Sequence, residues 1–364
     1  MGSTWGNILK ISLFGESHGE AVGAVIDGFP AGVSVDEEFV KEEMMRRAPG
    51  GRLATPRSES DECRIVSGVF KGISTGAPIC GIIRNSNTRS SDYLNLADVP
   101  RPSHADLSGI LRYQGYSDLR GGGHFSGRLT APLVFAGALC KLYLKGKGVV
   151  IGAHLDSVGT IKDQSFDLRH LNRELFDSLT PKELPFIDDE AGARATAEIL
   201  ARKQEGDSVG GVVESAVLGI KAGYGSPIFN AVESRIASLV FAIPGVKGVE
   251  FGEGFNIARM IGSQANDRFC IKDDRIYPET NYNGGCLGGI TTGAPIVFRA
   301  AFKPTASIGK PQLTANIRTG GMEELVIEGR HDPCIAVRAV PVVEAAAAIA
   351  VADLMLEALG YERP

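Results

Sequence analysis

The sequence lacks the cysteine spacing and the long uncharged apolar run that mark several large classes of protein. Its six cysteines, at positions 63, 80, 140, 270, 286 and 334, are scattered with no C-x-x-C pair. This pattern predicts reduced thiols and neither a disulfide framework nor a zinc site. The most apolar stretch, Val340 to Leu359, contains Glu344, Asp353 and Glu357, and therefore predicts an alanine-rich helix rather than a membrane span.

An excess of positive charge is also missing. The net charge of −5 argues against general affinity for nucleic acids or acidic membranes. No basic segment followed by a long apolar run lies near the N-terminus, so no signal peptide is expected. With 43% hydrophobic and 22% charged residues, the composition is typical of a cytoplasmic globular protein, and 364 residues suffice for a substantial core.

Arginine is distributed unevenly along the chain. Of 24 arginines and 14 lysines, 11 arginines but only 3 lysines lie in residues 1–128. Arginine binds carboxylate and phosphate through two parallel hydrogen bonds, so this concentration predicts a local pocket for a small polyanion. The strongest candidates flank the loop 48–51: they are Arg46, Arg47, Arg52 and Arg57.

The sequence repeats itself once. "GISTGAPI" (72–79) returns as "GITTGAPI" (289–296), and "VGAVIDGFPAG" (22–32) has a weaker counterpart at 209–223. Two related halves predict a pseudo-symmetric unit rather than an array of short repeats. Each copy is expected to form a strand, a glycine turn and another strand, and we hypothesise a ligand cleft between the halves.

Hydrophobic periodicity predicts a mixture of strands and helices in blocks. Strands are expected at 8–14, 21–27, 79–83 and 295–301. Helices are expected at 34–47, 131–145, 187–204, 228–242 and 341–359. Ser34 with Glu37 predicts a capping box for the first helix, and 160–187 is expected to be an extended connection. Because the elements do not alternate strictly, the pattern favours an α+β fold with antiparallel sheets.

The stretch "FGESHG" (14–19) has two interpretations. Gly15 to Gly19 fits the G-x-S-x-G pattern of a serine hydrolase with Ser17 as nucleophile, but that motif needs a helix directly after the serine. The residues that follow, 20–26, are glycine-interrupted and β-branched, which is a poor helix start. His18 is therefore the stronger candidate for acid–base chemistry.

Three further histidines occur in loops rich in glycine, proline or arginine: His104 in "RPSHAD", His124 in "RGGGHFSGR" and His331 in "GRHDPC". The glycines at 121–123 allow backbone amides to approach an anion closely. No pair of histidines has metal-ligand spacing, so no metal is expected. His154 and His170 are predicted to be structural or exposed.

Five of these segments together resemble the chorismate synthase family. They are "GESHG" (15–19), "RPSHAD" (101–106), "RGGG" (120–123), "KPT" (303–305) and "RHDPC" (330–334), and they follow the family's order over essentially the whole chain. The resemblance implies a single domain, residues 1–364, with two pseudo-symmetric halves and a β-α-β sandwich fold. It also implies a homotetramer.

For activity, the resemblance implies the 1,4-anti elimination of phosphate from 5-enolpyruvylshikimate 3-phosphate, the last step of the shikimate pathway to aromatic amino acids. His18 would protonate the departing phosphate, His104 would protonate or stabilise the reduced flavin, and Asp332 would act with the flavin in removing the ring proton. The substrate anions would be held by Arg47, Arg52, Arg128 and Arg330.

The same resemblance implies reduced FMN as cofactor. By match to the family, its contacts would be His124, Phe125, Ser126, Gly288, Lys303, Pro304, Thr305, Ala306, Ser307 and Arg330. At 123–128 the chain departs from the family's usual Gly-Arg-Ser-Ser-Ala-Arg, so backbone amides are expected to serve there. Three alternatives stay open: NADPH binding at Arg47 and Arg52, reduction of the flavin by the chain itself, and dependence on a separate flavin reductase.

Two other functions compete with this one. A serine hydrolase would use Ser17 and would react with a fluorophosphonate. A non-catalytic flavin-binding protein would bind FMN and leave the substrate unchanged, although mere binding needs no set of acid–base groups.

Overall fold

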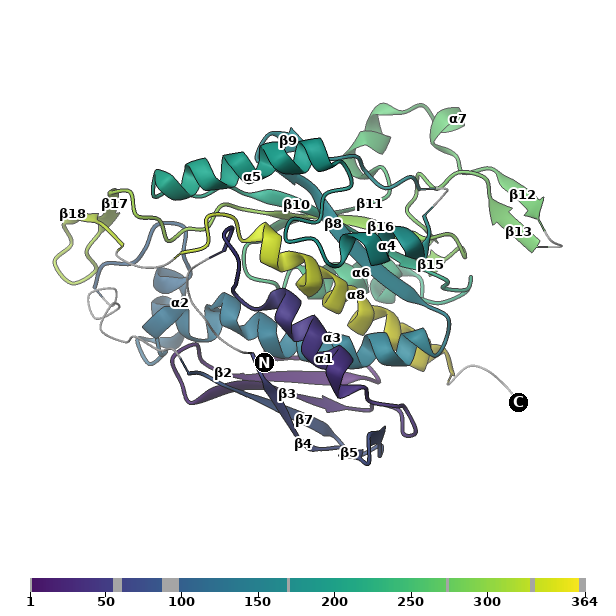
Figure 1. Ribbon diagram of the computed structural model, residues 1–364, viewed down its shortest axis with the longest axis horizontal. Helices are drawn as coiled ribbons and strands as arrows, with labels where there is room; N and C mark the ends of the chain where they lie inside the picture. The colour runs from purple at the N-terminus through teal and green to yellow at the C-terminus, as the bar shows by residue number, and fades with distance from the viewer. Residues whose placement is uncertain are drawn as a thin grey trace.

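The computed structural model describes residues 2–54, 61–86, 98–168, 171–272, 275–327 and 331–359. Two antiparallel sheets of five strands enclose a layer of helices (Figure 1). The first sheet, in spatial order, consists of β1 (Thr4–Trp5), β2 (Lys10–Gly15), β3 (Ala21–Asp27), β7 (Ile79–Arg84) and β4 (Cys63–Ser67). The second consists of β11 (Val246–Phe251), β16 (Ile296–Phe302), β10 (Gly211–Leu218), β8 (Val150–Val158) and β9 (Ile161–Lys162).

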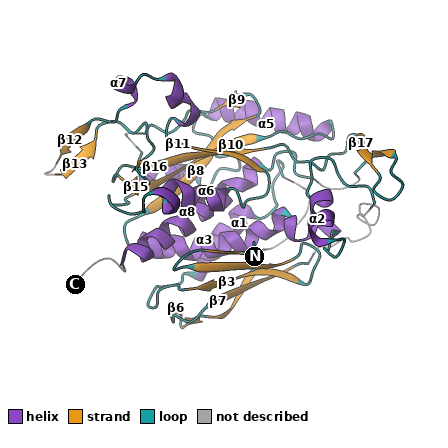
Figure 2. Ribbon diagram, turned by 180° about the vertical axis from the view of Figure 1, so that it is seen from behind, coloured by secondary structure: helices purple, strands orange, loops and turns teal. Residues whose placement is uncertain are grey.

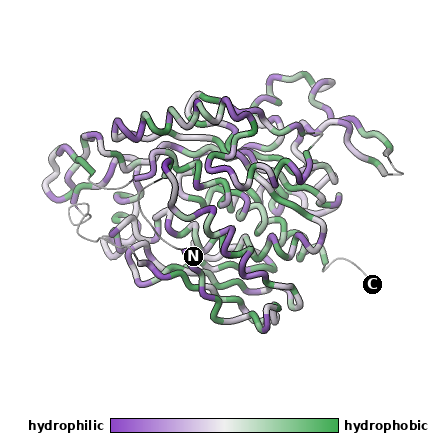
Figure 3. The backbone as a smooth tube through the Cα atoms, in the orientation of Figure 1, coloured by the Kyte–Doolittle hydropathy of each residue, from purple (hydrophilic) through white to green (hydrophobic). Residues whose placement is uncertain are grey.

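The helices between the sheets carry the core. They are α1 (Glu37–Arg47), α3 (Thr130–Lys145), α6 (Val232–Val240) and α8 (Ala336–Leu359). Hydrophobic segments gather along these central helices and the strands that face them (Figure 3). The helices α3 and α8 approach closely because Gly137 faces Ala345: a Cβ at position 137 would lie 2.5 Å from the Ala345 Cα.

The C-terminal helix α8 is long and apolar enough to cross a membrane by length and composition alone. However, 94% of its most apolar window is buried inside the protein. Glu344 in this helix pairs with Arg46 and Lys141, and Asp353 is fully buried. The helix therefore packs as the central core helix. The sequence predicted an alanine-rich helix here, but it begins at Ala336 rather than at residue 341 and includes Pro341.

The remaining helices and hairpins lie around this sandwich. The helices are α2 (Asp106–Tyr113), α4 (Arg173–Leu179), α5 (Asp189–Gln204) and α7 (Gly262–Ala265). The hairpins are β5 (Val69–Phe70) with β6 (Ile73–Ser74), β12 (Phe269–Lys272) with β13 (Arg275–Pro278), β14 (Cys286–Leu287) with β15 (Ile290–Thr291), and β17 (Gln312–Ala315) with β18 (Met322–Leu325). From behind, α2 and β17 lie at one end of the molecule, and β12 and β13 project from the other (Figure 2).

The internal repeat appears in the fold as one order of six elements that occurs twice, with other helices and hairpins inserted between them. The series β2, β3, α1, β4, β7, α3 matches β8, β10, α6, β11, β16, α8, and the sheet orders β2-β3-β7-β4 and β8-β10-β16-β11 correspond. Each "G-I-[ST]-T-G-A-P-I" copy forms a short hairpin strand, a glycine turn and then β7 or β16. Gly76 and Gly293 occupy equivalent turns with φ of 85° and 90°, where glycine avoids backbone strain.

Three local predictions were wrong. The helix α1 is capped by Asp36 rather than Ser34, because the Asp36 carboxylate accepts hydrogen bonds from the amides of Glu38 (3.1 Å) and Phe39 (3.2 Å). The segment 228–242 is divided into a 3₁₀ turn (Ile228–Asn230) and the shorter α6. The connection 160–187 contains β9 and α4, since Phe176 of α4 packs onto Gly152 in the second sheet.

Candidate active site

The turn that carries His18 joins β2 to β3 and is held by backbone and amide hydrogen bonds. The Ser17 amide donates to the Gly123 carbonyl (3.1 Å). Asn85, which follows β7, donates from its Nδ2 to the carbonyls of Glu16 (3.0 Å) and Gly19 (2.9 Å). His18 is therefore buried and fixed at the end of the first sheet. Since Ser17 lies in a strand–strand turn, the nucleophile elbow of a serine hydrolase is absent there.

In the glycine turn at 121–123, His18 lies against Gly121 and His104 lies against the next residue, Gly122. All three glycines are left-handed, with φ of 61°, 87° and 54°. A Cβ on Gly121 would lie 2.6 Å from Nε2 of His18, and a Cβ on Gly122 would lie 3.4 Å from Nε2 of His104. Consecutive Cα atoms are about 3.8 Å apart, so the two imidazoles border the same short stretch of backbone.

His104 belongs to a buried hydrogen-bonded group with Arg101 and Asp106. The Asp106 carboxylate lies 2.6 Å from His104 Nδ1 and accepts from Arg101 Nε (2.7 Å) and a terminal guanidinium nitrogen (2.8 Å). Burial alone would raise the pKa of Asp106, but the hydrogen bonds from Arg101 and His104 outweigh it and hold that pKa well below its usual value. Asp106 is therefore an ionised carboxylate.

The loop after β16 lies against this group. Arg101 donates to Ser307 Oγ (3.1 Å), and the Lys303 ammonium donates to Ser103 Oγ (2.9 Å). Burial, with the nearby charge of Lys247, lowers the pKa of Lys303. The segment 303–307, predicted to contact a flavin, thus adjoins the His104 loop.

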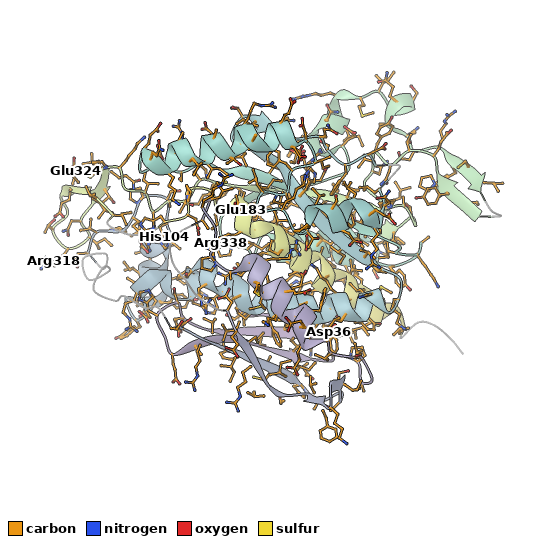
Figure 4. All side chains as sticks on the ribbon, viewed as in Figure 1. Asp36, His104, Glu183, Arg318, Glu324 and Arg338 are labelled. Carbon is orange, nitrogen blue, oxygen red and sulfur yellow. The ribbon has the colours of Figure 1, made fainter. Side chains whose placement is uncertain are left out.

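Asp332 is connected to the same loop and to α1. The Thr305 hydroxyl donates to the Asp332 carbonyl (2.9 Å). Arg338, at the start of α8, donates to the Asp332 carboxylate (2.5 Å) and to the carbonyl of Arg47 (3.1 Å). Figure 4 shows Arg338 on this first turn of α8 and His104 beside α2.

Two of the predicted anion-binding arginines converge on a buried carboxylate. Arg47 donates to one oxygen of Asp61 (2.5 Å), and Arg128 donates to the other. Arg128 also donates from Nε to Asn85 Oδ1 (2.9 Å), which connects this pair to the His18 turn. All three charged side chains are at most 6% exposed.

These residues form a ring of neighbours that hydrogen bonds join except at two places: Thr305 and Ser307 are connected along the backbone, and His104 lies against the glycine turn without a hydrogen bond that closes the ring. From the His18 turn, the connections run through Asn85, Arg128, Asp61, Arg47, Arg338, Asp332, Thr305, Ser307, Arg101, Asp106 and His104 back to the glycine turn. Loops far apart in the sequence therefore bring His18, His104 and Asp332 to one region with arginines around them.

Several predicted cofactor residues lie outside this ring. The ring nitrogens of His124 lie within hydrogen-bond distance of the Gly15 carbonyl (2.8 Å) and Ser3 Oγ (3.0 Å), and Phe125 packs on Gly109 and Tyr113. Ser126 caps the 3₁₀ turn Gly127–Leu129.

Other predicted residues lie further along the chain or outside the described part. Gly288 forms the β14–β15 turn, before β16, whereas Lys303 follows β16. Pro304 packs near Gly210, and Ala306 is half-buried. Arg330, Arg57 and His170 lie outside the described residues.

The predicted arginine pocket around 48–51 is only partly present. Arg46 pairs instead with Glu43 and Glu344 in the core, and burial opposes but does not cancel the rise in its pKa caused by these carboxylates. The Arg52 side chain is 68% exposed and lies 3.8 Å from Glu183. A cavity of about 300 Å³ lies beside this loop and reaches Arg338, and a second of similar size lies beside Phe166; neither lining includes His18, His104 or Asp332.

Sequence reasoning gave no site role to five residues of the ring: Asp61, Asn85, Arg101, Asp106 and Arg338. Arg101 and Asp106 lie in the quoted "RPSHAD" motif, where only His104 was assigned a role. Asn85 had one usable signal, because a polar residue directly after a buried strand often lies at a site. Asp61 and Arg338 had none, since each is recognisable only through a partner distant in sequence.

Of the histidines outside the site, His154 is structural as predicted. It is buried between Asp163 (3.1 Å) and Glu214 (3.0 Å), and these hydrogen bonds, which outweigh desolvation, raise its pKa. In the part of the chain that the structure describes, no group of three potential ligands could hold a metal ion.

Gly121→Ala is expected to lower kcat at least about tenfold, because the methyl group would overlap the His18 imidazole and displace it. Gly115→Ala is the matched control. Gly115 also has a positive φ, of 80°, but a Cβ at that position would have no atom within 4 Å, so the substitution carries the backbone strain alone, about 1–2 kcal/mol. Equal activity losses in the two variants would contradict the contact with His18. Steady-state kinetics at matched thermal stability measure the difference.

The fold and these contacts define an α+β protein whose loops assemble an arginine-rich acid–base site. A sequence model of the chorismate synthase family matches residues 9–356. The chain is 46% identical to chorismate synthase of Thermococcus kodakarensis over 360 residues, 98% of each chain. It is 43% identical to that of Methanosarcina barkeri over 364 residues, 100% of this chain and 98% of the relative.

A crystal structure of chorismate synthase superimposes with a TM-score of 0.77 at 30% identity, covering 98% of this chain and 94% of that one. This chain therefore belongs to the chorismate synthase family. It is a family of amino-acid biosynthetic enzymes that act on a small-molecule substrate.

Proposed function

We propose that this chain catalyses the 1,4-anti elimination of phosphate from 5-enolpyruvylshikimate 3-phosphate to give chorismate. The carrying observation is that His18 and His104 border one glycine turn inside a ring that also contains Asp332 and the arginines. A substrate with one phosphate and two carboxylates suits such an arginine-rich site in an otherwise acidic chain.

The residues divide the work of the elimination. The Asp332 carboxylate accepts the ring proton, and the C–H electron pair shifts through the ring as the allylic C–O bond breaks and the phosphate leaves. His18 donates a proton to the departing phosphate. Arg47 and Arg128 hold substrate anions by exchanging their contacts with Asp61, and Arg52 and Arg330 contribute further positive charge. General acid–base groups of this kind each supply about 10²–10⁴-fold in rate.

The residues also fit a flavin. The hydroxyls of Thr305 and Ser307 lie on the loop that adjoins the His104 group, and the glycine turn 121–123 brings its backbone close to both imidazoles. We propose that reduced FMN is held by this turn, by Ser126 and by 303–307. When bound, reduced FMN supplies electron density that promotes C–O cleavage without net oxidation. His104 presents its Nε2 to this region for proton exchange.

We extend the proposal to a cytoplasmic homotetramer. The β12–β13 arm exposes Phe269 (63%), Ile271 (79%) and Ile276 (71%), and apolar side chains gathered in this way are typical of an interaction surface. Light scattering after size exclusion should give four times the chain mass of 38.5 kDa. A monomer would contradict this part of the proposal.

An anaerobic assay tests the reaction. Purified protein with chemically reduced FMN should release phosphate and form chorismate from 5-enolpyruvylshikimate 3-phosphate. Oxidised FMN alone should give none. Turnover without any flavin, or tight FMN binding with no turnover, would contradict the proposal.

The source of reducing equivalents is a separate question that the same assay answers. With NADPH and oxidised FMN, and with no dithionite, phosphate release would show that the chain reduces its own flavin. Arg47→Ala and Arg52→Ala would then test the NADPH contacts. If no phosphate is released until a flavin reductase is added, the reductant comes from a separate protein.

A further inference from the structure

We propose that Asp106 is the positioning residue of His104: it fixes the imidazole with its proton on Nδ1 and so leaves Nε2 as the nitrogen that exchanges protons in the site. The role of His104 rests on the proposed function, but its tautomer does not. The inference depends on the hydrogen-bond pattern around a single buried carboxylate.

The hydrogen-bond partners of His104 Nδ1 show that this nitrogen carries the proton. An ionised carboxylate only accepts hydrogen bonds, so the 2.6 Å separation of Asp106 Oδ1 and His104 Nδ1 requires a hydrogen on Nδ1. The Arg101 nitrogen 3.0 Å from Nδ1 also donates to Asp106 Oδ1 (2.8 Å), so it does not need Nδ1 as an acceptor. The neutral imidazole is therefore the Nδ1–H tautomer.

The second step is the rigidity of Asp106. Its Oδ2 accepts from the Arg101 amide (3.1 Å) and from Arg101 Nε (2.7 Å), and its Oδ1 accepts from the guanidinium and from His104. The carboxylate is 2% exposed and begins α2, where a negative charge is favoured by the helix dipole. Every oxygen is thus used twice, and rotation of the carboxylate would break several bonds at once.

The third step is the direction of Nε2. The His104 side chain is 21% exposed, and its Nε2 faces Gly122, where glycine supplies no side chain to cover it. His124, which follows the glycine turn, leaves neither ring nitrogen open in this way, because both lie within hydrogen-bond distance of neighbouring oxygens. Arg101 also bonds Ser307, so the group that orients His104 is tied to the proposed flavin-binding loop.

The test is ¹⁵N NMR of histidine-labelled, deuterated protein at pH 8.5, with His104 identified by its absence in His104→Gln. In the wild type, His104 should show a protonated Nδ1 and an unprotonated Nε2. In Asp106→Asn, the amide can donate to Nδ1, and the proton should move to Nε2. Asp163→Asn is the matched control, since it alters a second Asp–His pair (His154 Nδ1, 3.1 Å) and should leave the His104 signals unchanged.

Kinetics supply the second readout. Asp106→Asn should lower kcat by about 10²-fold or more, with KM within about twofold, because the acid–base group rather than the binding contact is altered. An Nε2–H tautomer in the wild type overturns the inference even if the variant does not fold. It is likewise overturned if Asp106→Asn leaves the tautomer or kcat unchanged. If the tautomers behave as expected but the wild type releases no phosphate, the proposed function fails and the positioning of His104 stands.

Discussion

His18→Ala should lower kcat by about 10²–10⁴-fold, the usual contribution of a general acid. The phosphate would then leave without a proton from the protein, while Arg47 and Arg128 would still neutralise part of its charge. KM should change much less, since the arginines and not the imidazole carry the binding. Phosphate release under anaerobic conditions with reduced FMN measures both constants.

Folding must be controlled because His18 is buried. Circular dichroism and a thermal melt should show that His18→Ala keeps the native fold, and equilibrium titration should show that it still binds FMN. A folded variant with near-normal kcat would remove His18 from the mechanism. Separately, fluorophosphonate labelling of Ser17 would revive the hydrolase interpretation.

Asp353→Ala should destabilise the fold by about 3–5 kcal/mol, as expected when one partner of a buried charge pair is removed. Asp353, in the C-terminal part of α8, is completely buried and accepts hydrogen bonds from the amides of Asn7 (3.0 Å), Ile8 (2.8 Å) and Leu9 (2.7 Å). It also pairs with Arg235 of α6. One carboxylate thus joins the segment just before β2, the helix α6 and the core helix α8.

The control is Glu357→Ala, one turn further along α8. Glu357 is partly exposed, accepts a long hydrogen bond from Asn7 Nδ2 (3.4 Å) and interacts electrostatically with Arg235, so its removal should cost about 1 kcal/mol or less. Urea denaturation gives both values. Arg235 lies between this carboxylate and Trp5, with its Cζ 4.2 Å from the centre of the Trp5 ring. Similar losses of unfolding free energy in the two variants would contradict the stabilising role of Asp353.

Strong local patterns made much of the architecture predictable. The strand at 21–27 and the helices at 131–145 and 187–204 appear within two residues of their predicted bounds, because each has a clear apolar period and few competing turn residues. The repeated "GAPI" segment correctly predicted two equivalent strand–turn–strand units. Where tertiary contact decides, prediction failed: α4 forms because Phe176 and Leu179 are buried against the second sheet, which no local signal shows.

The site residues also fall into those that the sequence indicates and those that only the folded chain reveals. His18, His104 and the glycine turn could be found from residue chemistry, and the family resemblance supplied their order and roles. Asp61 could not, because its function as the common partner of Arg47 and Arg128 exists only after residues 47, 61 and 128 meet in space. Arg46 shows the converse. The sequence predicted it to bind an anionic ligand, but it forms ion pairs with Glu43 of α1 and Glu344 of α8 in the core.

The central claim is that these separated loops grip one substrate. A crystal structure with FMN and 5-enolpyruvylshikimate 3-phosphate tests it directly. We expect the substrate phosphate within hydrogen-bond distance of His18, the ring beside Asp332, and the flavin against residues 121–123 and 303–307. Substrate bound on another face of the molecule, touching none of residues 18, 104 and 332, would contradict the account.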